Sequence, residues 1–200
     1  MSTTLRQAAF HRYPILVISG GSSGIGRGLL EAYFNARVDG LAINLSRSCP
    51  DELLQEPRLT HLPCDLSDAS GRATTFEQLV QLIHERSPEG ELLLVNNSGM
   101  GDFGSFPKLA RERLLQTIDL NVSGTIDLSM RLLPLLRERG GTLMTIASTS
   151  AFQPTPMMAT YGATKAFLVH WSLALNEELR GSKVSALAVC PGPTYTDFLS

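Results

Sequence analysis

Short apolar segments alternate along this chain with longer segments of helical periodicity. The apolar segments are Pro14–Ser19, Gly40–Leu45, Thr60–Cys64, Glu91–Val95, Thr142–Ala147 and Val184–Val189. The helical segments are Ile25–Phe34, Asp68–Glu85, Lys108–Arg139 with a bend near Pro134, and Thr160–Arg180. Strands that are apolar on both faces are typical of a parallel sheet covered by helices on both sides. Because crossover connections are right-handed, we expect a three-layer α/β/α sandwich with strand order 3-2-1-4-5-6.

The bulk properties limit what such a chain can be. With 200 residues, it is long enough for one domain, which follows a polar N-terminal extension over 1–13. The formal net charge of −2 and the lack of a long apolar run predict neither a nucleic-acid partner nor a membrane partner. Cys49, Cys64 and Cys190 form no paired motif, which favours reduced thiols and a cytoplasmic location. The histidines lie at no metal-ligand spacing, so we expect no metal.

A glycine-rich loop joins the first apolar segment to the first helix. Glycines permit a tight turn and let the backbone approach a pyrophosphate, while the helix start offers free N–H groups. Ligands of such sheets bind at the carboxyl ends of the strands, where this loop lies. The loop therefore predicts dinucleotide binding, through Gly20, Ser22, Ser23, Gly24, Ile25 and Gly26.

The end of the second apolar segment bears on which dinucleotide is bound. An acid about 20 residues past the glycines would hold a ribose hydroxyl, whereas an arginine suits a 2′-phosphate. Here Arg47 lies 21 residues past Gly26, and no acid stands at that strand end. We therefore expect NADP(H) to be preferred over NAD(H).

Tyr161 and Lys165 lie four residues apart, and hence on one helix face. A phenol has a pKa of about 10, and a fixed ammonium nearby favours the phenolate and lowers that pKa. The pair is thus a candidate general acid and base. The alternative is an ordinary helix face with one extended lysine.

Taken in order, these motifs resemble the short-chain dehydrogenase/reductase family, in the branch whose subunits have about 250 residues. The resemblance runs from Pro14 to Asp197 and implies a Rossmann-type fold. It implies a catalytic tetrad of Asn121, Ser148, Tyr161 and Lys165, with Ser148 standing 13 residues before Tyr161.

The resemblance also implies cofactor contacts after the later strands. Asp65 and Leu66 match the contact to the adenine ring, and Asn97, Ser98 and Gly99 resemble a signature in which alanine usually replaces Ser98. The segment after the sixth strand matches the contact to the nicotinamide end, through Pro191, Gly192, Thr194 and Thr196. Tyr161 and Lys165 are expected to contact the cofactor as well.

The expected function is reduction of a ketone or aldehyde with NADPH, or the reverse oxidation of an alcohol. One alternative is a catalytically silent cofactor-sensing protein of the same fold, and another is a sugar-nucleotide epimerase, which needs a longer chain. A small and apolar substrate is suggested by residues expected in nearby loops, namely Phe103, Phe152, Met157 and Met158. These four residues would equally serve to pack those loops.

Two expectations concern the whole protein. The sequence stops at Asp197–Ser200, where the family carries a substrate lid, a further helix and a seventh strand, so we expect the sequence to be incomplete. The family commonly forms homodimers or homotetramers through the two long helices, which here are Lys108–Arg139 and Thr160–Arg180.

Overall fold

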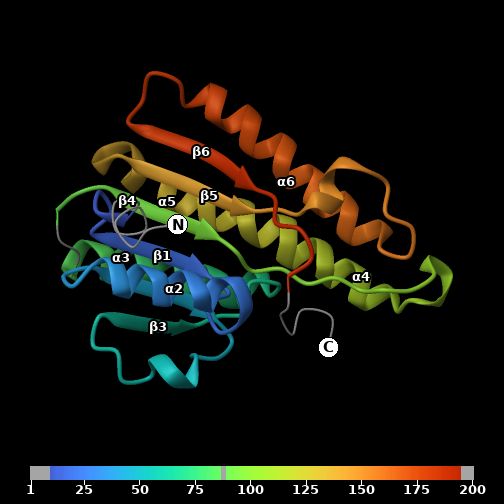
Figure 1. Ribbon diagram of the computed structural model, residues 1–200, viewed down its shortest axis with the longest axis horizontal. Coiled ribbons are helices and arrows are strands. Elements are labelled where there is room, and N and C mark those ends of the chain that lie inside the picture. The colour runs from blue at the N-terminus through green and yellow to red at the C-terminus, as the bar shows by residue number, and fades with distance from the viewer. Residues whose placement is uncertain (1–9, 87–88, 195–200) are drawn as a thin grey trace.

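Six parallel strands form one sheet in the order β3-β2-β1-β4-β5-β6, as predicted (Figure 1). The computed structural model describes residues 10–86 and 89–194. The strands are β1 (Ile15–Ser19), β2 (Leu41–Ser46), β3 (Leu59–Pro63), β4 (Leu92–Asn96), β5 (Gly141–Ile146) and β6 (Val184–Val189). Each strand end lies within one residue of its predicted position.

Both faces of the sheet are packed. Along β1, Ile15 and Val17 join a core that includes side chains of α3 (Ala69–Arg86) and α5 (Gly124–Arg139). The alternate residues Leu16 and Ile18 pack on the other face, against α2 (Gly24–Ala36). All five residues of β1 are buried, because successive side chains point to opposite faces and each face is covered. The three-layer arrangement is therefore confirmed.

The predicted helix over Lys108–Arg139 is wrong in two respects. Lys108 ends a separate 3₁₀ turn, η2 (Phe106–Lys108), and the helix α4 (Arg111–Ile118) begins after it. A π-helical turn, η3 (Asp119–Ser123), then separates α4 from α5. Such turns interrupt regular helices and are frequent at functional sites. Pro134 lies within α5, so the interruption lies well before the proline.

The carboxyl ends of the strands meet at one edge of the sheet, because all six strands run in the same direction (Figure 1). The connections after β1, β3 and β4 lead from this edge into α2, α3 and, through η2, α4, and the connection after β5 leads through η4 (Thr149–Phe152) into α6 (Ala159–Glu178). The fold thus brings segments from distant parts of the sequence to one place.

Candidate active site

The glycine loop after β1 is tightly curled. Gly20 and Gly24 have φ values of +69° and +52°, a region that L-residues with a side chain rarely adopt. A Cβ atom on Gly26 would lie 2.1 Å from the carbonyl oxygen of Gly20 and 2.5 Å from Nδ2 of Asn97. The loop therefore closes on itself at a point where only glycine fits.

The start of α2 leaves this loop suited to an anion. The Ser23 side chain makes no capping hydrogen bond, and no acid lies in the first helical turn. The unpaired N–H groups and the helix dipole at such an end attract phosphate charge. Ser22 and Ile25 flank this position. The loop and helix start therefore fit the pyrophosphate of a dinucleotide cofactor.

Hydrogen bonds between the ends of β1 and β4 hold the glycine loop in place. The Asn97 amide donates to the carbonyl oxygens of Ser19 at 3.1 Å and Gly20 at 2.8 Å, while Ser19 Oγ accepts from the N–H groups of Asn97 and Ser98, both at 3.0 Å. Asn97, which was expected from the sequence to contact the cofactor, braces the loop in the structure. Sequence reasoning did not identify Ser19, which ends β1 and ties the loop to the β4 end of the sheet.

Asn44 is a second brace that sequence reasoning missed. Its Oδ1 accepts from the N–H of Gly21 at 2.9 Å, and its Nδ2 donates to Ser46 Oγ at 2.9 Å and lies 3.3 Å from Nδ1 of His61. Asn44 is fully buried in the middle of β2. An asparagine inside an otherwise apolar strand was the available signal, because a buried amide requires partners.

The residues expected around the adenosine half lie at the ends of β2 and β3. Arg47 follows β2 and is exposed. Asp65 follows β3, and its Oδ1 accepts from the N–H of Ser67 at 2.9 Å and from Ser67 Oγ at 2.6 Å. Leu66, next to Asp65, is buried.

Ser148 and Tyr161 come together after β5. Ser148 caps η4 by accepting from the N–H of Ser150 at 3.1 Å, and its side chain is largely buried. Burial raises the pKa of Tyr161, and a hydrogen bond with Ser148 lowers it without cancelling the rise. The expected lowering of this pKa is therefore wrong for the protein alone, since burial outweighs the neighbouring groups. Tyr161 holds its proton near neutral pH and is arranged as an acid.

Lys165 lies beneath the tyrosine ring, with Nζ 5.7 Å from the ring centroid. The residue is 3% exposed, and Nζ donates to the carbonyl oxygen of Ile146 at 2.8 Å. Burial lowers the pKa of Lys165 to about 8, and nearby Cys190 opposes this shift. The ammonium is therefore held in a fixed place at a cost in solvation.

Asn121 sits in the π-helical turn η3 and is fully buried. Its Oδ1 accepts from the N–H of Met100 at 2.9 Å, and its Nδ2 donates to the Met100 carbonyl at 2.9 Å and to Thr164 Oγ1 at 3.0 Å. Thr164 in turn donates to the carbonyl of Tyr161 at 2.7 Å. Asn121 thus links the β4 loop to α6.

The loop after β4 packs closely on the candidate catalytic residues. A Cβ atom on Gly99 would lie 3.2 Å from Lys165 Nζ and 3.4 Å from Asn121 Oδ1. One on Gly101 would lie 2.8 Å from Cδ2 of Tyr161. Gly101 was not among the predicted site residues, although its small size is what lets the loop pass the tyrosine ring.

Beside Tyr161 is a pocket of about 50 Å³. Its walls include Phe106, Leu109 and Met157, and Gly104 donates its N–H to the Met157 carbonyl at 2.8 Å, which joins the two flanking loops. Met157 has a φ of +68°. Of the predicted apolar residues, Met157 lines this pocket, whereas Phe103 and Phe152 are each 69% exposed.

The segment after β6 lies beside η4, because the N–H of Thr149 donates to the Pro191 carbonyl at 3.0 Å. Gly192 is exposed and would meet no atom within 4 Å if it carried a Cβ. Thr194 is exposed and donates to the Gly192 carbonyl at 3.0 Å. Thr196 lies outside the described residues.

Among residues 10–86 and 89–194, no three metal-ligating side chains gather at one place. No helix in these ranges has the length and apolar character needed to cross a membrane.

The buried ammonium of Lys165 predicts a pH-dependent stability. Between about pH 8 and 10.5 the folded protein releases this proton while the unfolded chain retains it, so the wild type gains stability as pH rises. Lys165→Met removes the effect. We expect the free energy of unfolding of the wild type to rise relative to that of Lys165→Met over this window, by at most about 1.4 kcal/mol per pH unit. Urea unfolding of both cofactor-free proteins from pH 7.5 to 10 measures it, and a constant difference would contradict it.

Comparisons with known proteins agree with this geometry. The family model for short chain dehydrogenase matches residues 14–200. The chain is 32% identical over 185 residues to the 2,3-dihydro-2,3-dihydroxybenzoate dehydrogenase of Escherichia coli, with 90% of this chain and 69% of that protein covered.

Solved structures show the same likeness. A short-chain dehydrogenase from Streptomyces avermitilis superimposes with a TM-score of 0.82 at 27% identity, over 94% of this chain and 69% of that one. A 3-ketoacyl-(acyl-carrier-protein) reductase from Brucella melitensis, complexed with NADH, gives a TM-score of 0.78 over 92% of this chain and 77% of that one. Its 24% identity shows the fold alone. From its family-model match and its E. coli relative, the chain belongs to the short-chain dehydrogenase family of NAD(P)-dependent oxidoreductases.

Proposed function

We propose that this protein reduces a carbonyl compound with NADPH, or oxidises the corresponding alcohol. The observation that carries the proposal is the grouping of Ser148, Tyr161 and Lys165 at the edge of the sheet where the glycine loop lies. The loop from Gly20 to Gly26 would hold the pyrophosphate, and the segment that begins at Pro191 would contact the nicotinamide end. When bound, the nicotinamide supplies or accepts the hydride.

The chain's own residues handle the proton. Ser148 donates a hydrogen bond that orients the substrate oxygen, and Tyr161 Oη gives that oxygen its proton in the reducing direction. Lys165 places a positive charge under the phenol and stabilises the phenolate that remains. Asn121 links the β4 loop to α6. In this proposal it also supports a proton relay from the site to solvent.

The direct test follows NADPH absorbance while the purified protein is given a panel of ketones and aldehydes. Turnover of any of these carbonyls supports the proposal. The alternative, a cofactor-sensing protein, predicts NADPH binding by calorimetry with no oxidation of NADPH above the uncatalysed rate.

Preference for NADP(H) is part of the proposal and rests on Arg47. Its exposed side chain follows β2, and a guanidinium pairs well with a phosphate. We expect Arg47→Ala to weaken NADPH binding about tenfold, which equals about 1.4 kcal/mol, and to leave NADH binding unchanged. Calorimetric titration with both cofactors measures this, with Arg111→Ala as a control at a distant exposed site. Equal losses of affinity for NADPH and NADH would contradict the assignment of Arg47 to the 2′-phosphate.

The substrate, partners and location complete the proposal. An apolar substrate is supported by Phe106, Leu109 and Met157, which line the pocket beside Tyr161. A homodimer or homotetramer through α5 and α6 is supported by Met130 and Leu173, which are 63% and 61% exposed on these helices. A cytoplasmic location suits the three free cysteines.

A further inference from the structure

Arg72 is a charged side chain that the fold buries away from the candidate catalytic residues. It lies on α3 and is only 8% exposed. Removing a guanidinium from water costs several kcal/mol, and an apolar residue of similar volume is often at least as stabilising. A buried arginine at this place therefore calls for a reason other than stability.

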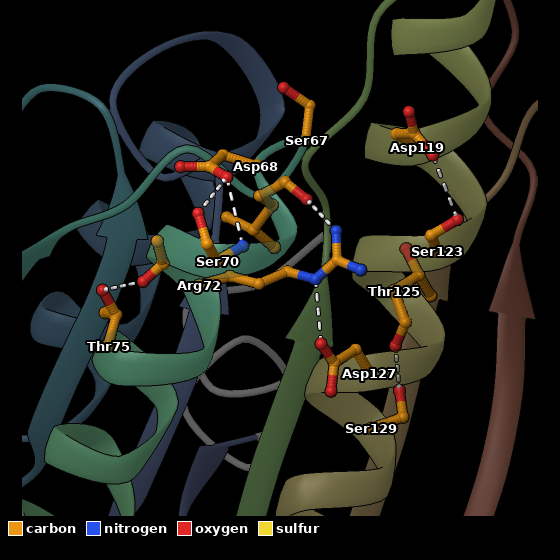
Figure 2. Close-up of polar contacts among 12 residues, drawn as sticks. Ser67, Asp68, Ser70, Arg72, Thr75, Asp119, Ser123, Thr125, Asp127 and Ser129 are labelled. Atoms are coloured by element: carbon orange, nitrogen blue, oxygen red, sulfur yellow. Dashed lines mark hydrogen bonds and ion pairs between the residues drawn. The ribbon is translucent and has the colours of Figure 1, made fainter.

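The guanidinium joins two parts of the fold. Its Nε donates to Oδ2 of Asp127 on α5 at 2.8 Å, and its Nη1 donates to the carbonyl oxygen of Leu66 at 2.9 Å. Figure 2 shows the side chain reaching from α3 across to α5, with Asp127 on one side of the guanidinium. The rigid planar fork of arginine can make both bonds at once, which a lysine cannot do with the same geometry.

The Leu66 carbonyl belongs to the turn that follows β3 and carries Asp65. This turn is docked on the first residue of α5, because a Cβ atom on Gly124 would lie 2.7 Å from the Leu66 oxygen and 3.1 Å from Leu66 Cβ. Arg72 thus ties this turn to α5. The turn has little freedom to shift while both bonds are in place.

We propose that Arg72 is a positioning residue for the adenine end of the cofactor, and that Asp127 holds it in place. The inference rests on the proposed function and on the adenine-ring contact that the family resemblance implies for Asp65 and Leu66. Fixing the Leu66 carbonyl fixes the backbone on which both contacts depend, so the adenine subsite is formed before the ligand arrives. Such preorganisation lowers the cost of binding.

The test separates the two halves of the cofactor. Binding of 2′-phospho-ADP-ribose and of reduced nicotinamide mononucleotide is measured by NMR titration for the wild type and for Arg72→Met. We expect affinity for 2′-phospho-ADP-ribose to fall about tenfold and affinity for the mononucleotide to stay within about twofold. Asp127→Asn keeps an oxygen acceptor for Arg72 and is expected to show a smaller loss with the same selectivity.

Arg86→Met is the matched control, because Arg86 lies on the same helix and is exposed. It should bind both fragments as the wild type does. If Arg72→Met and Asp127→Asn lower the affinity for both fragments equally, or for neither, Arg72 is only a structural residue. The inference then fails while the proposed function stands. A wild-type protein that binds neither fragment overturns the proposed function as well.

Discussion

Replacing Tyr161 by phenylalanine is expected to lower carbonyl turnover about a thousandfold while NADPH still binds, as judged by calorimetry. In the proposed function the phenol gives its proton to the substrate oxygen, and its raised pKa keeps that proton available near neutral pH. Phenylalanine keeps the ring that packs on Gly101 and removes only the hydroxyl. Steady-state kinetics with saturating NADPH measures the effect on kcat.

Tyr13→Phe is the control for this experiment. Tyr13 is also buried, and its hydroxyl lies 2.7 Å from Thr142 Oγ1 in β5, outside the grouped catalytic residues. Loss of that hydroxyl should affect stability and leave turnover intact. If the Tyr161 variant kept more than about a tenth of wild-type kcat, another group would be the proton donor.

The second large effect is expected from Gly26→Ala. The new methyl group would lie 2.1 Å from a backbone oxygen and 2.5 Å from the Asn97 amide, so the glycine loop itself has to open. Overpacking of this kind costs about 1–3 kcal/mol. An opened loop loses its fit to pyrophosphate, and we expect NADPH affinity to fall about 100-fold, or about 2.7 kcal/mol.

Gly28→Ala is an unusually close control, since Gly28 lies two residues further along the same helix. A Cβ atom there would meet nothing within 4 Å. Alanine is favoured over glycine in a helix interior by about 1 kcal/mol. This variant should therefore melt higher than the wild type and bind NADPH normally. Similar affinities in the two variants would show that the curl of the loop is unimportant for binding.

The fold was predictable because its determinants are local and repeated. Most strands are apolar runs, although β3 contains Thr60 and His61, and each crossover has a strongly preferred hand. The π-helical turn at Asn121 was not predictable in the same way. It depends on Asn121 reaching the backbone of Met100, 21 positions earlier, and no periodic pattern in α4 or α5 encodes that contact.

Members of the candidate site could be named from the sequence where residue type alone dictates chemistry, as for Tyr161 and Lys165. Supporting residues such as Asn44 and Arg72 were missed, because their roles arise from partners that only folding brings close. The pKa of Tyr161 shows the same limit. Residue spacing revealed a neighbouring ammonium, whereas the degree of burial, which has the larger effect, is a property of the packed structure.

Met157 has a consequence for how this enzyme could diversify. Its left-handed backbone is a conformation that costs a non-glycine residue about 1–2 kcal/mol, and its side chain helps to wall the pocket beside Tyr161. A change to glycine would relieve that strain and enlarge the pocket at once. Broader substrate range usually evolves at the expense of stability. At this position the relief of strain would offset the entropy that glycine adds to the unfolded chain, so a single mutation could enlarge the pocket at little cost in stability.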